Sequence, residues 1–279
     1  MKENHFLSVD WGTSNLRLRL VEVQTLSVLE EVKSSQGIVK TFELWNKSGG
    51  DREEFYLKFL KSQLDKFTIP ISGTVKIIIS GMSSSSIGIK ELPYASLPFD
   101  YSGSTLHVER ISNEGFPLKV LLISGVRSER DVMRGEEVQV LGLIQDLKIT
   151  GFSTLVFPGT HSKHIVCNDG KVRDFKTYMT GEMFHVISEY TILKNSISKQ
   201  DSNEGIDSFD EGLMRSQEDS SLLHDLFSIR ASDLTHTKTK TENSYYLSGL
   251  LIGDEISALQ SDTVQTIFLC AGGNLFNLY

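Results

Sequence analysis

The sequence predicts an α/β chain of two domains, on three observations. Short apolar runs, which are typical of buried strands, alternate with stretches whose apolar residues recur at helical spacing. A strand, a turn of small residues and a second strand open the chain, and the same pattern returns after residue 150. The length of 279 residues is enough for two domains that each bury a core. We expect a first domain over residues 1–148 and a second over residues 149–279.

The first domain opens with three strands that tight turns connect. The expected strands of this domain are residues 7–10, 16–23, 26–33, 75–80 and 120–124. Helical spacing predicts a helix over residues 52–67, between the third and fourth strands, and another over residues 134–147. Three hairpin-linked strands, a helix and a further strand are the beginning of a ribonuclease-H-like domain, so we expect that architecture.

The second domain repeats this opening and continues with helices. Its expected strands are residues 153–157, 164–167, 172–176 and 266–270, and its expected helices are residues 180–193, 208–216, 221–230 and 245–259. Polar loops are expected at residues 194–207 and 217–220. Gly249 and Gly253 lie four residues apart in the last helix, which predicts close packing against another helix.

The two turns of small residues have the composition of phosphate-binding hairpins. In the first, Asp10 ends a strand and is placed to hold Mg²⁺ through water, while Gly12 lets the backbone approach a phosphate. Successive amides in such a turn can donate to phosphate oxygens. The residues expected to bind nucleotide phosphates are Gly12, Thr13, Ser14, Asn15, Gly159, Thr160 and His161. A pair of unrelated tight hairpins, in which Asp10 only caps its turn, is the alternative that turn chemistry leaves open.

A glycine pair follows the last expected strand. Ala271, Gly272 and Gly273 leave room for a flat ligand to lie against the backbone. In actin-like kinases the adenosine motif lies at this place, so a resemblance to them implies the adenosine part of a nucleotide at these three residues.

Six blocks, in the same order along the chain, resemble the 2-dehydro-3-deoxygalactonokinase family. These blocks are VDWGTSNLR (9–17), SGM (80–82), VMRGEE (132–137), PGTHSK (158–163), DFKTYMTGE (174–182) and LSGLLIG (247–253). The resemblance implies an actin-like, two-domain kinase with ATP and Mg²⁺ as cofactors. It also implies transfer of the γ-phosphate to a primary hydroxyl of a six-carbon keto-deoxy sugar acid, most closely 2-dehydro-3-deoxy-D-galactonate.

The resemblance also places a general base at the start of the helix near residue 135. In related carbohydrate kinases a Gly-Asp pair opens this helix, and its carboxylate faces the acceptor hydroxyl. Gly135 and Glu136 stand at that place here, with Glu one methylene longer than Asp. The choice between Glu136 and Glu137 stays open, and acids in a first helical turn also favour the helix dipole without any chemical role. The expected catalytic residues are thus Asp10, Glu136 and Glu137.

The carboxylate of a sugar acid needs hydrogen-bond donors. Arg17 and Arg134 offer bidentate geometry, and Met82 and Ser83 begin the loop after Gly81. These four residues are the expected substrate-binding residues. A structural ion pair is the alternative for Arg17, because it lies within a strand.

Charge and hydropathy exclude several partners. The net charge is −8 and no basic block occurs, so we expect no nucleic-acid partner. No apolar run approaches a membrane span and the N-terminus lacks a signal region, so we expect a cytoplasmic protein whose partners are small molecules. A homo-oligomer stays open.

The C-terminal end is shorter than the family pattern. Relatives continue past the glycine pair with another strand and helix, whereas this chain stops at Tyr279. We therefore expect an incomplete second domain and weakened ATP binding. A non-catalytic actin-like sugar-binding or assembly module, or a kinase for a different sugar acid, are the alternatives.

Overall fold

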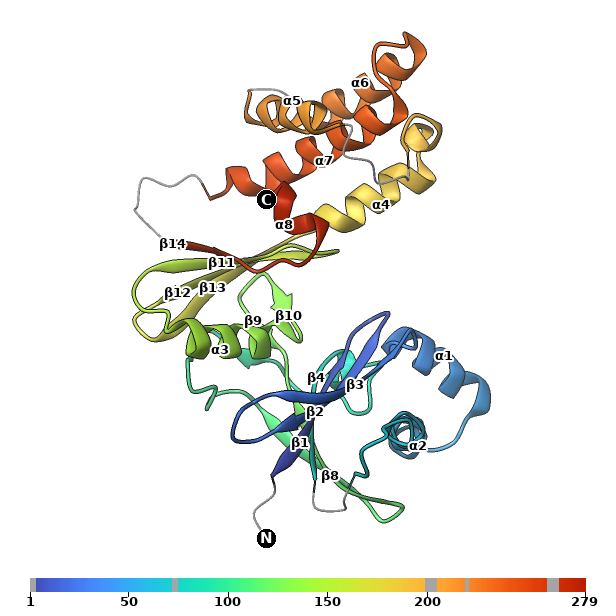
Figure 1. Ribbon diagram of the computed structural model, residues 1–279, viewed down its shortest axis with the longest axis vertical. Helices are drawn as coiled ribbons and strands as arrows, with labels where there is room; N and C mark the ends of the chain where they lie inside the picture. Colours follow the sequence, from blue (N-terminus) through green and yellow to red (C-terminus); the bar gives the residue numbers. More distant parts are fainter. Residues whose placement is uncertain (1–3, 72–74, 199–204, 219–220, 260–265) are drawn as a thin grey trace. The chain divides into compact units, whose positions relative to one another are not determined.

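The computed structural model is a mixed α/β chain that divides into two compact units (Figure 1). It describes residues 4–71, 75–198, 205–218, 221–259 and 266–279. Unit 1 comprises Met1–Thr150 and Asp169–Asp174, and unit 2 comprises Gly151–Asn168 and Phe175–Tyr279. None of the helices in the described ranges combines the length and apolar character that crossing a membrane requires.

Unit 1 is built on a sheet with the strand order β3-β2-β1-β4-β8-β7. The strands are β1 (His5–Trp11), β2 (Leu16–Glu22), β3 (Val28–Ser34), β4 (Lys76–Gly81), β7 (Val108–Asn113) and β8 (Phe116–Ile123). β2 pairs antiparallel with both β1 and β3, whereas β4 pairs parallel with β1 and β8. The parallel pairing brings the ends of β1 and β4 together, with Asp10 opposite Ser80 and Trp11 opposite Gly81.

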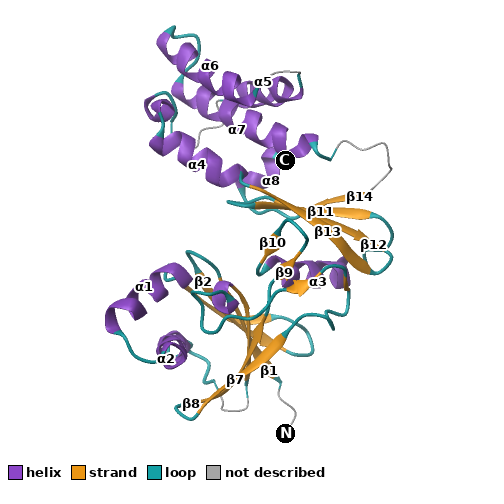
Figure 2. Cartoon of the chain, turned by 180° about the vertical axis from the view of Figure 1, so that it is seen from behind, coloured by secondary structure: helices purple, strands orange, loops and turns teal. Residues whose placement is uncertain are grey.

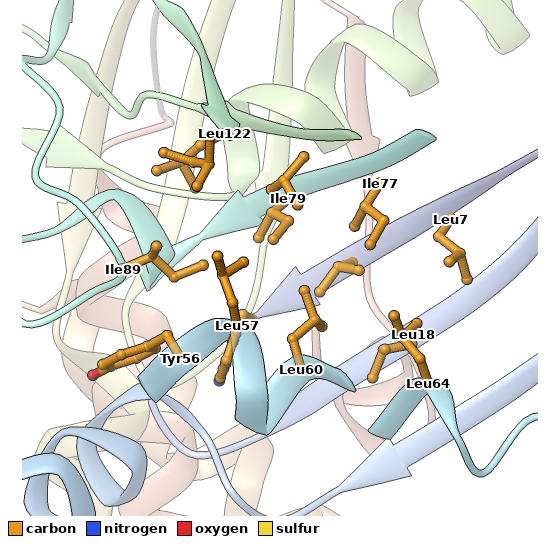
Figure 3. Close-up of a cluster of buried hydrophobic side chains, with 14 of the residues drawn as sticks. Leu7, Leu18, Tyr56, Leu57, Leu60, Leu64, Ile77, Ile79, Ile89 and Leu122 are labelled. Carbon is orange, nitrogen blue, oxygen red and sulfur yellow. The ribbon is translucent and has the colours of Figure 1, made fainter. Parts of the chain in front are cut away.

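One face of this sheet forms the core of unit 1. Helices α1 (Ile38–Ser48) and α2 (Arg52–Leu64) lie along one side of the sheet (Figure 1). Alternate residues of β1 point to the same face, and Leu7, Val9 and Trp11 are fully buried in one cluster with the apolar side chains of α2. Figure 3 shows Leu7 in this cluster together with Leu57, Leu60 and Leu64 of α2. The Trp11 ring lies 5.6 Å from the rings of both Tyr56 and Phe59. Asp10 therefore lies on the face of the sheet that points away from α2.

Shorter elements complete unit 1. They are the 3₁₀ turn η1 (Met82–Ser84), strands β5 (Ala95–Ser96), β6 (Phe99–Asp100), β9 (Val126–Arg127) and β10 (Val132–Met133), and helix α3 (Glu136–Leu147). β9 pairs with both β5 and β10. β6 pairs antiparallel with Lys171 and Val172, which is why the segment Asp169–Asp174 belongs to this unit.

Unit 2 combines a sheet with a group of helices (Figure 2). Its strands are β11 (Ser153–Phe157), β12 (Ser162–Asn168), β14 (Thr266–Leu269) and the part of β13 (Lys171–Tyr178) that begins at Phe175, in the order β14-β11-β12-β13. Its helical elements are α4 (Thr180–Tyr190), η2 (Ile192–Asn195), α5 (Ile206–Gln217), α6 (Leu222–Leu234), α7 (Lys240–Ser257) and α8 (Asn274–Leu278). A Cβ at Gly249 would lie 2.1 Å from the Phe209 carbonyl oxygen, so α5 and α7 pack with their backbones nearly touching. This confirms the close helix packing that the glycine spacing predicts.

The structure differs from the sequence expectations at several places. α1, β7 and α8 were not expected, α7 begins at Lys240 rather than near residue 245, and α3 begins at Glu136 rather than at residue 134. Gly135 has a φ of +107°, which is not helical and ends the extended chain before α3. Within the loop expected at residues 194–207, residues 199–204 lie outside the described residues, as do residues 219–220 of the loop at 217–220.

Candidate active site

The turn between β1 and β2, residues 12–15, is held from behind by the start of α1. We call this turn the first hairpin. The amides of Gly37, Ile38 and Val39 donate to the carbonyls of Ser14, Gly12 and Thr13, with N···O distances of 3.1, 2.9 and 3.3 Å. The C=O and N–H of a trans peptide point in opposite directions, so the amides of residues 13–15 face away from α1. Successive N–H groups on one side of a turn form an anion-binding concavity.

Asp10 lies at the base of the first hairpin, on the end of β1. Its Cα partners across the sheet are Arg17 on β2 and Ser80 on β4, and Arg17 Nη1 lies 4.0 Å from Asp10 Oδ2. Burial raises the pKa of the Asp10 carboxyl, Arg17 and Arg19 oppose that effect, and the negative charge of Glu136 adds to it. Asp10 and Glu136 are therefore close enough to influence each other electrostatically.

Two glycines bring the end of β1 and the start of α3 together. Gly81 has a φ of +89°, and a Cβ there would lie 2.8 Å from the Trp11 carbonyl oxygen and 3.5 Å from Asp10 Oδ1. A Cβ at Gly135 would in turn lie 3.4 Å from the Gly81 Cα. The loop after β4 and the N-terminus of α3 thus lie directly beside the end of β1, where Asp10 is.

The neighbouring carboxylates Glu136 and Glu137 lie in different environments. Glu137 is fully buried, and both its carboxylate oxygens accept from the Gly135 amide at 2.9 and 2.7 Å. Burial raises the pKa of Glu137 to about 8, with a further contribution from Glu136. Glu136 is half-buried, and one of its oxygens accepts from the Arg134 amide at 3.1 Å. Glu137 is thus engaged in holding the start of α3, while Glu136 is the carboxylate whose charge acts on Asp10.

Arg134 holds the loop that follows β4. Its guanidinium donates to the carbonyl and hydroxyl oxygens of Ser84, both at 2.6 Å, to the Tyr94 hydroxyl at 3.2 Å and to the Leu92 carbonyl at 3.5 Å. It also lies over the Tyr94 ring, 4.1 Å from the centroid. Four contacts to protein acceptors occupy most of the five N–H groups of an arginine.

Met82 and Ser83, in η1, lie within this loop. Ser83 is fully buried, and no hydrogen-bond partner for its hydroxyl occurs among the described residues. Arg17, by contrast, is about half exposed on the outer face of β2. Of the expected substrate-binding residues, Arg17 is therefore the one whose charge is most accessible.

In unit 2 the turn between β11 and β12, residues 158–161, is the second hairpin. The Ser162 hydroxyl accepts from the Gly159 amide at 3.2 Å, and the Thr160 carbonyl accepts from the Glu182 amide of α4 at 3.0 Å. His161 Nε2 lies 2.5 Å from Glu182 Oε2 at the surface of the unit. The start of α4 thus packs against this hairpin as the start of α1 packs against the first.

A buried polar network around Glu255 lies beneath the second hairpin. Glu255, on α7, is only 1% exposed and contacts His164 Nε2 at 2.9 Å, the Thr180 hydroxyl and the Tyr279 hydroxyl at 2.6 Å. Burial alone would raise the pKa of Glu255, but these three hydrogen bonds outweigh it and lower the pKa. Tyr279 also contacts the Ser162 hydroxyl at 3.2 Å, which links the network to the hairpin.

The backbone of the glycine pair after β14 has free space beside it. A Cβ at Gly272 or Gly273 would meet no heavy atom of the described residues within 4 Å. Gly273 has a φ of +58° and precedes α8. Ala271 is half-buried between these glycines and the strand. This geometry leaves space beside the backbone at the place where the sequence predicts an adenosine site.

Sequence reasoning missed the supporting residues Gly37, Glu255 and Tyr279. Glu255 stands in a GDEIS stretch that is typical of a solvated helix end, so only the packing of α7 shows that it is buried. Gly37 follows two serines and a glutamine, a composition that reads as a loop. The regular spacing of Ile38, Phe42 and Trp45 was the available signal for a helix after it.

Comparison with known proteins places the chain in a family. The family model described as 2-keto-3-deoxy-galactonokinase matches residues 10–279. A protein of Rhizobium meliloti (strain 1021), assigned as a 2-dehydro-3-deoxygalactonokinase, is 32% identical over 281 residues, which cover 99% of this chain and 87% of that protein. The 2-dehydro-3-deoxygalactonokinase of Escherichia coli (strain K12) is 28% identical over 276 residues, which cover 98% of this chain and 87% of that protein.

A solved structure agrees with these matches. The crystal structure of a protein from Sinorhizobium meliloti, also assigned as a 2-dehydro-3-deoxygalactonokinase, superposes with a TM-score of 0.83 at 30% identity. The superposition covers 98% of this chain and 86% of that one. The resemblance carried by the six sequence blocks is confirmed: the chain belongs to the 2-keto-3-deoxy-galactonokinase family.

Proposed function

We propose that this chain is an ATP-dependent kinase that phosphorylates the primary hydroxyl of 2-dehydro-3-deoxy-D-galactonate. The observation that carries the proposal is the family match, which extends over residues 10–279 and includes both hairpins and the start of α3. Relatives named 2-dehydro-3-deoxygalactonokinase align over nearly the whole chain. The kinase class follows from the family.

The strand order supports an actin-like, ribonuclease-H-like architecture for each unit. In unit 1, β1 lies between antiparallel β2 and parallel β4, with β3 beyond β2. In unit 2, β11 lies in the same way between antiparallel β12 and parallel β14, with β13 beyond β12. The two units therefore repeat one topology, in which the hairpin after the first strand is the phosphate-binding element.

The residues of the first hairpin fit nucleotide phosphates and a metal ion. Its amides at residues 13–15 face away from α1, and the Asp10 carboxylate lies beside them. Mg²⁺, when bound, supplies charge neutralisation for the phosphoryl group that is transferred. Asp10 would hold this ion through water, and residues 12–15 would hold the phosphates.

Unit 2 has its own set of proposed nucleotide-binding residues. Gly159, Thr160 and His161 hold phosphate oxygens from the second hairpin, which is the topological equivalent of the first. The open backbone at residues 271–273 accepts the adenosine part.

Glu136 is the general base of the proposed reaction. It accepts the proton of the acceptor hydroxyl as the oxygen attacks the γ-phosphorus, and ADP leaves. Its carboxylate is half-buried near Asp10, whereas the Glu137 carboxylate is committed to the Gly135 amide. Glu137 fixes the turn that presents Glu136.

The acceptor carboxylate is bound by Arg17 in this proposal, from the outer face of β2. Arg134 acts with it by fixing the loop that contains Met82 and Ser83. Met82, which is half-buried, contacts the body of the sugar acid in this proposal, whereas the fully buried Ser83 side chain supports the loop from within and is not assigned a substrate contact. An arginine is suited to this task because its planar donors match a carboxylate.

An ADP-release assay across acceptors tests the proposal. Purified chain is incubated with Mg·ATP and either 2-dehydro-3-deoxy-D-galactonate, its gluconate epimer or no acceptor. We expect the highest kcat/KM with the galactonate derivative and only background ADP release without acceptor. Release that is equal with and without acceptor would indicate an ATPase, and higher kcat/KM with the epimer would assign a different sugar acid.

A further inference from the structure

We infer that Gly37 and Gly181 are positioning residues of the kinase reaction, each of which lets a helix begin directly against one phosphate hairpin. The inference rests on the proposed function, because that proposal assigns the hairpins to the phosphates of ATP. Neither glycine was expected in the site from the sequence, and neither is itself proposed to touch a substrate.

We call the contact of each glycine with its hairpin a brace, and the first brace lies between Gly37 and the first hairpin. A Cβ at Gly37 would lie 2.3 Å from the Thr13 carbonyl oxygen, 2.4 Å from the Ser14 carbonyl carbon and 2.5 Å from the Thr13 carbonyl carbon. The φ of Gly37 is −70° and its ψ is −176°, a conformation that any residue adopts. Space, rather than backbone conformation, therefore requires glycine at this position.

The second brace has the same construction in unit 2. Gly181 lies in the first turn of α4, and a Cβ there would lie 2.5 Å from the Gly159 carbonyl oxygen and 2.9 Å from the Thr160 Cα. The next amide, of Glu182, donates to the Thr160 carbonyl at 3.0 Å. The atoms that a Cβ would meet at both braces are backbone atoms, which cannot rotate away as a side chain can.

The braces set the orientation of the hairpin amides that are proposed to face the phosphates. Each hairpin carbonyl held by a helix start belongs to a rigid peptide plane whose N–H points to the other side. A methyl group at Gly37 or Gly181 would push the carbonyls, and the amides would turn with them. Misplacement of binding groups by about 1 Å can cost about a hundredfold in rate.

An added methyl group is not expected to displace hairpin amides at every helical glycine, so one such glycine serves as a matched control. Gly142, within α3, would have no heavy atom of the described residues within 4 Å of an added Cβ. Gly142→Ala removes the same backbone freedom as Gly37→Ala but displaces nothing, so it is expected to be neutral or stabilising.

The test compares Gly37→Ala, Gly181→Ala and Gly142→Ala with the wild type. Titration calorimetry gives the Kd for Mg·ATP, steady-state assays give the KM for Mg·ATP and for the sugar acid, and thermal melting gives Tm. We expect the Kd and KM for Mg·ATP to rise about tenfold or more in Gly37→Ala and Gly181→Ala. The KM for the sugar acid is expected to stay within about twofold of wild type, and Gly142→Ala is expected to match wild type in all three constants.

Two further variants separate positioning from loss of stability. Val120→Ala removes buried methyl groups from β8 and serves as a control that lowers Tm without touching a hairpin. Val39→Pro removes the amide that donates to the Thr13 carbonyl, in the first turn of a helix, where proline is tolerated, and at a side chain that is 41% exposed. It is expected to raise the KM for Mg·ATP by less than Gly37→Ala does.

The outcomes are distinct. Unchanged Mg·ATP binding in Gly37→Ala and Gly181→Ala, or kinetic changes no larger than those of Val120→Ala at equal loss of Tm, would overturn the inference. If the wild type binds Mg·ATP but transfers phosphate to no sugar acid, the proposed function fails, and the calorimetric comparison of the variants still decides the inference.

Discussion

At the scale of single residues, two adjacent carboxylates at the start of α3 differ in burial and in hydrogen bonding. Glu137 is fully buried and receives the Gly135 amide on both oxygens, so its negative charge is costly and its pKa rises to about 8. Glu136 is half-buried and interacts electrostatically with Asp10. The sequence places both acids in the first turn of a helix but contains nothing that distinguishes them, because burial depends on the packing around the turn.

Replacement of Glu136 is expected to abolish turnover. Glu136→Gln keeps the size and the hydrogen-bond acceptor but removes the proton-accepting carboxylate, so kcat is expected to fall by about a hundredfold or more. The Kd for Mg·ATP, measured by calorimetry, is expected to change little. Glu137→Gln is the matched control, and a larger loss of kcat in Glu137→Gln than in Glu136→Gln would assign the base to Glu137.

Glu137 is also expected to shape the pH dependence of stability. Its pKa is near 4.5 in the unfolded chain and about 8 in the folded protein, so the folded state binds more protons between these values. The free energy of unfolding of the wild type is therefore expected to fall, relative to Glu137→Gln, as the pH rises from about 4.5 to about 8, at a limiting slope of about 1.4 kcal/mol per pH unit.

Urea unfolding of both proteins across this range measures the difference. A gap between wild type and Glu137→Gln that does not change with pH would contradict the raised pKa of Glu137.

At the scale of elements, the start of a helix packs against each hairpin. α1 holds the first through backbone amides, and α4 holds the second with help from the network around Glu255 on α7. The sequence predicts the hairpins themselves because small residues between apolar strands have a local signature. The burial of Glu255 is set by long-range packing and could not be read from the sequence, whereas α1 has a signal in the spacing of Ile38, Phe42 and Trp45 that only its position after a polar, loop-like stretch obscures.

The Glu255 network is expected to stabilise unit 2 and the second hairpin together. Tyr279→Phe removes the hydroxyl that joins Glu255 to Ser162, at an expected cost of about 1–2 kcal/mol in the free energy of unfolding and a rise in the KM for Mg·ATP. Tyr190→Phe is the control, because Tyr190 is 77% exposed. Equal stability and equal KM in the two variants would show that the network does not support the hairpin.

The position of Glu255 depends on the long helix α7, which begins with a capping box. The Thr239 hydroxyl accepts from the Glu242 amide, and the Glu242 carboxylate accepts from the Thr239 amide. Thr239→Ala is expected to cost about 1 kcal/mol in urea unfolding. A Thr239→Ala protein as stable as the wild type would show that α7 is fixed by packing alone. The residues after Thr239 are polar and give no apolar periodicity, so the sequence predicts the start of this helix near residue 245 rather than at Lys240.

At the scale of the whole molecule, the chain uses one topology twice. The expected strands on both sides of each hairpin are present in the structure, and the family match over residues 10–279 agrees with the resemblance read from six sequence blocks. Local patterns were sufficient for these strands because their apolar runs are bounded by clear turn residues. β7 was missed because its residues 108–113 alternate only weakly between apolar and polar.

The central claim is that this chain transfers the γ-phosphate of ATP to a primary hydroxyl, and the product itself tests it most directly. Phosphorus NMR of the chain incubated with Mg·ATP and 2-dehydro-3-deoxy-D-galactonate distinguishes the bond that forms. We predict a phosphomonoester signal coupled to the protons of a CH₂ group, with ADP in equal amount, and formation of the ester about a hundredfold or more slower with Glu136→Gln. Inorganic phosphate in place of the ester, or an ester on a secondary carbon, would contradict the account.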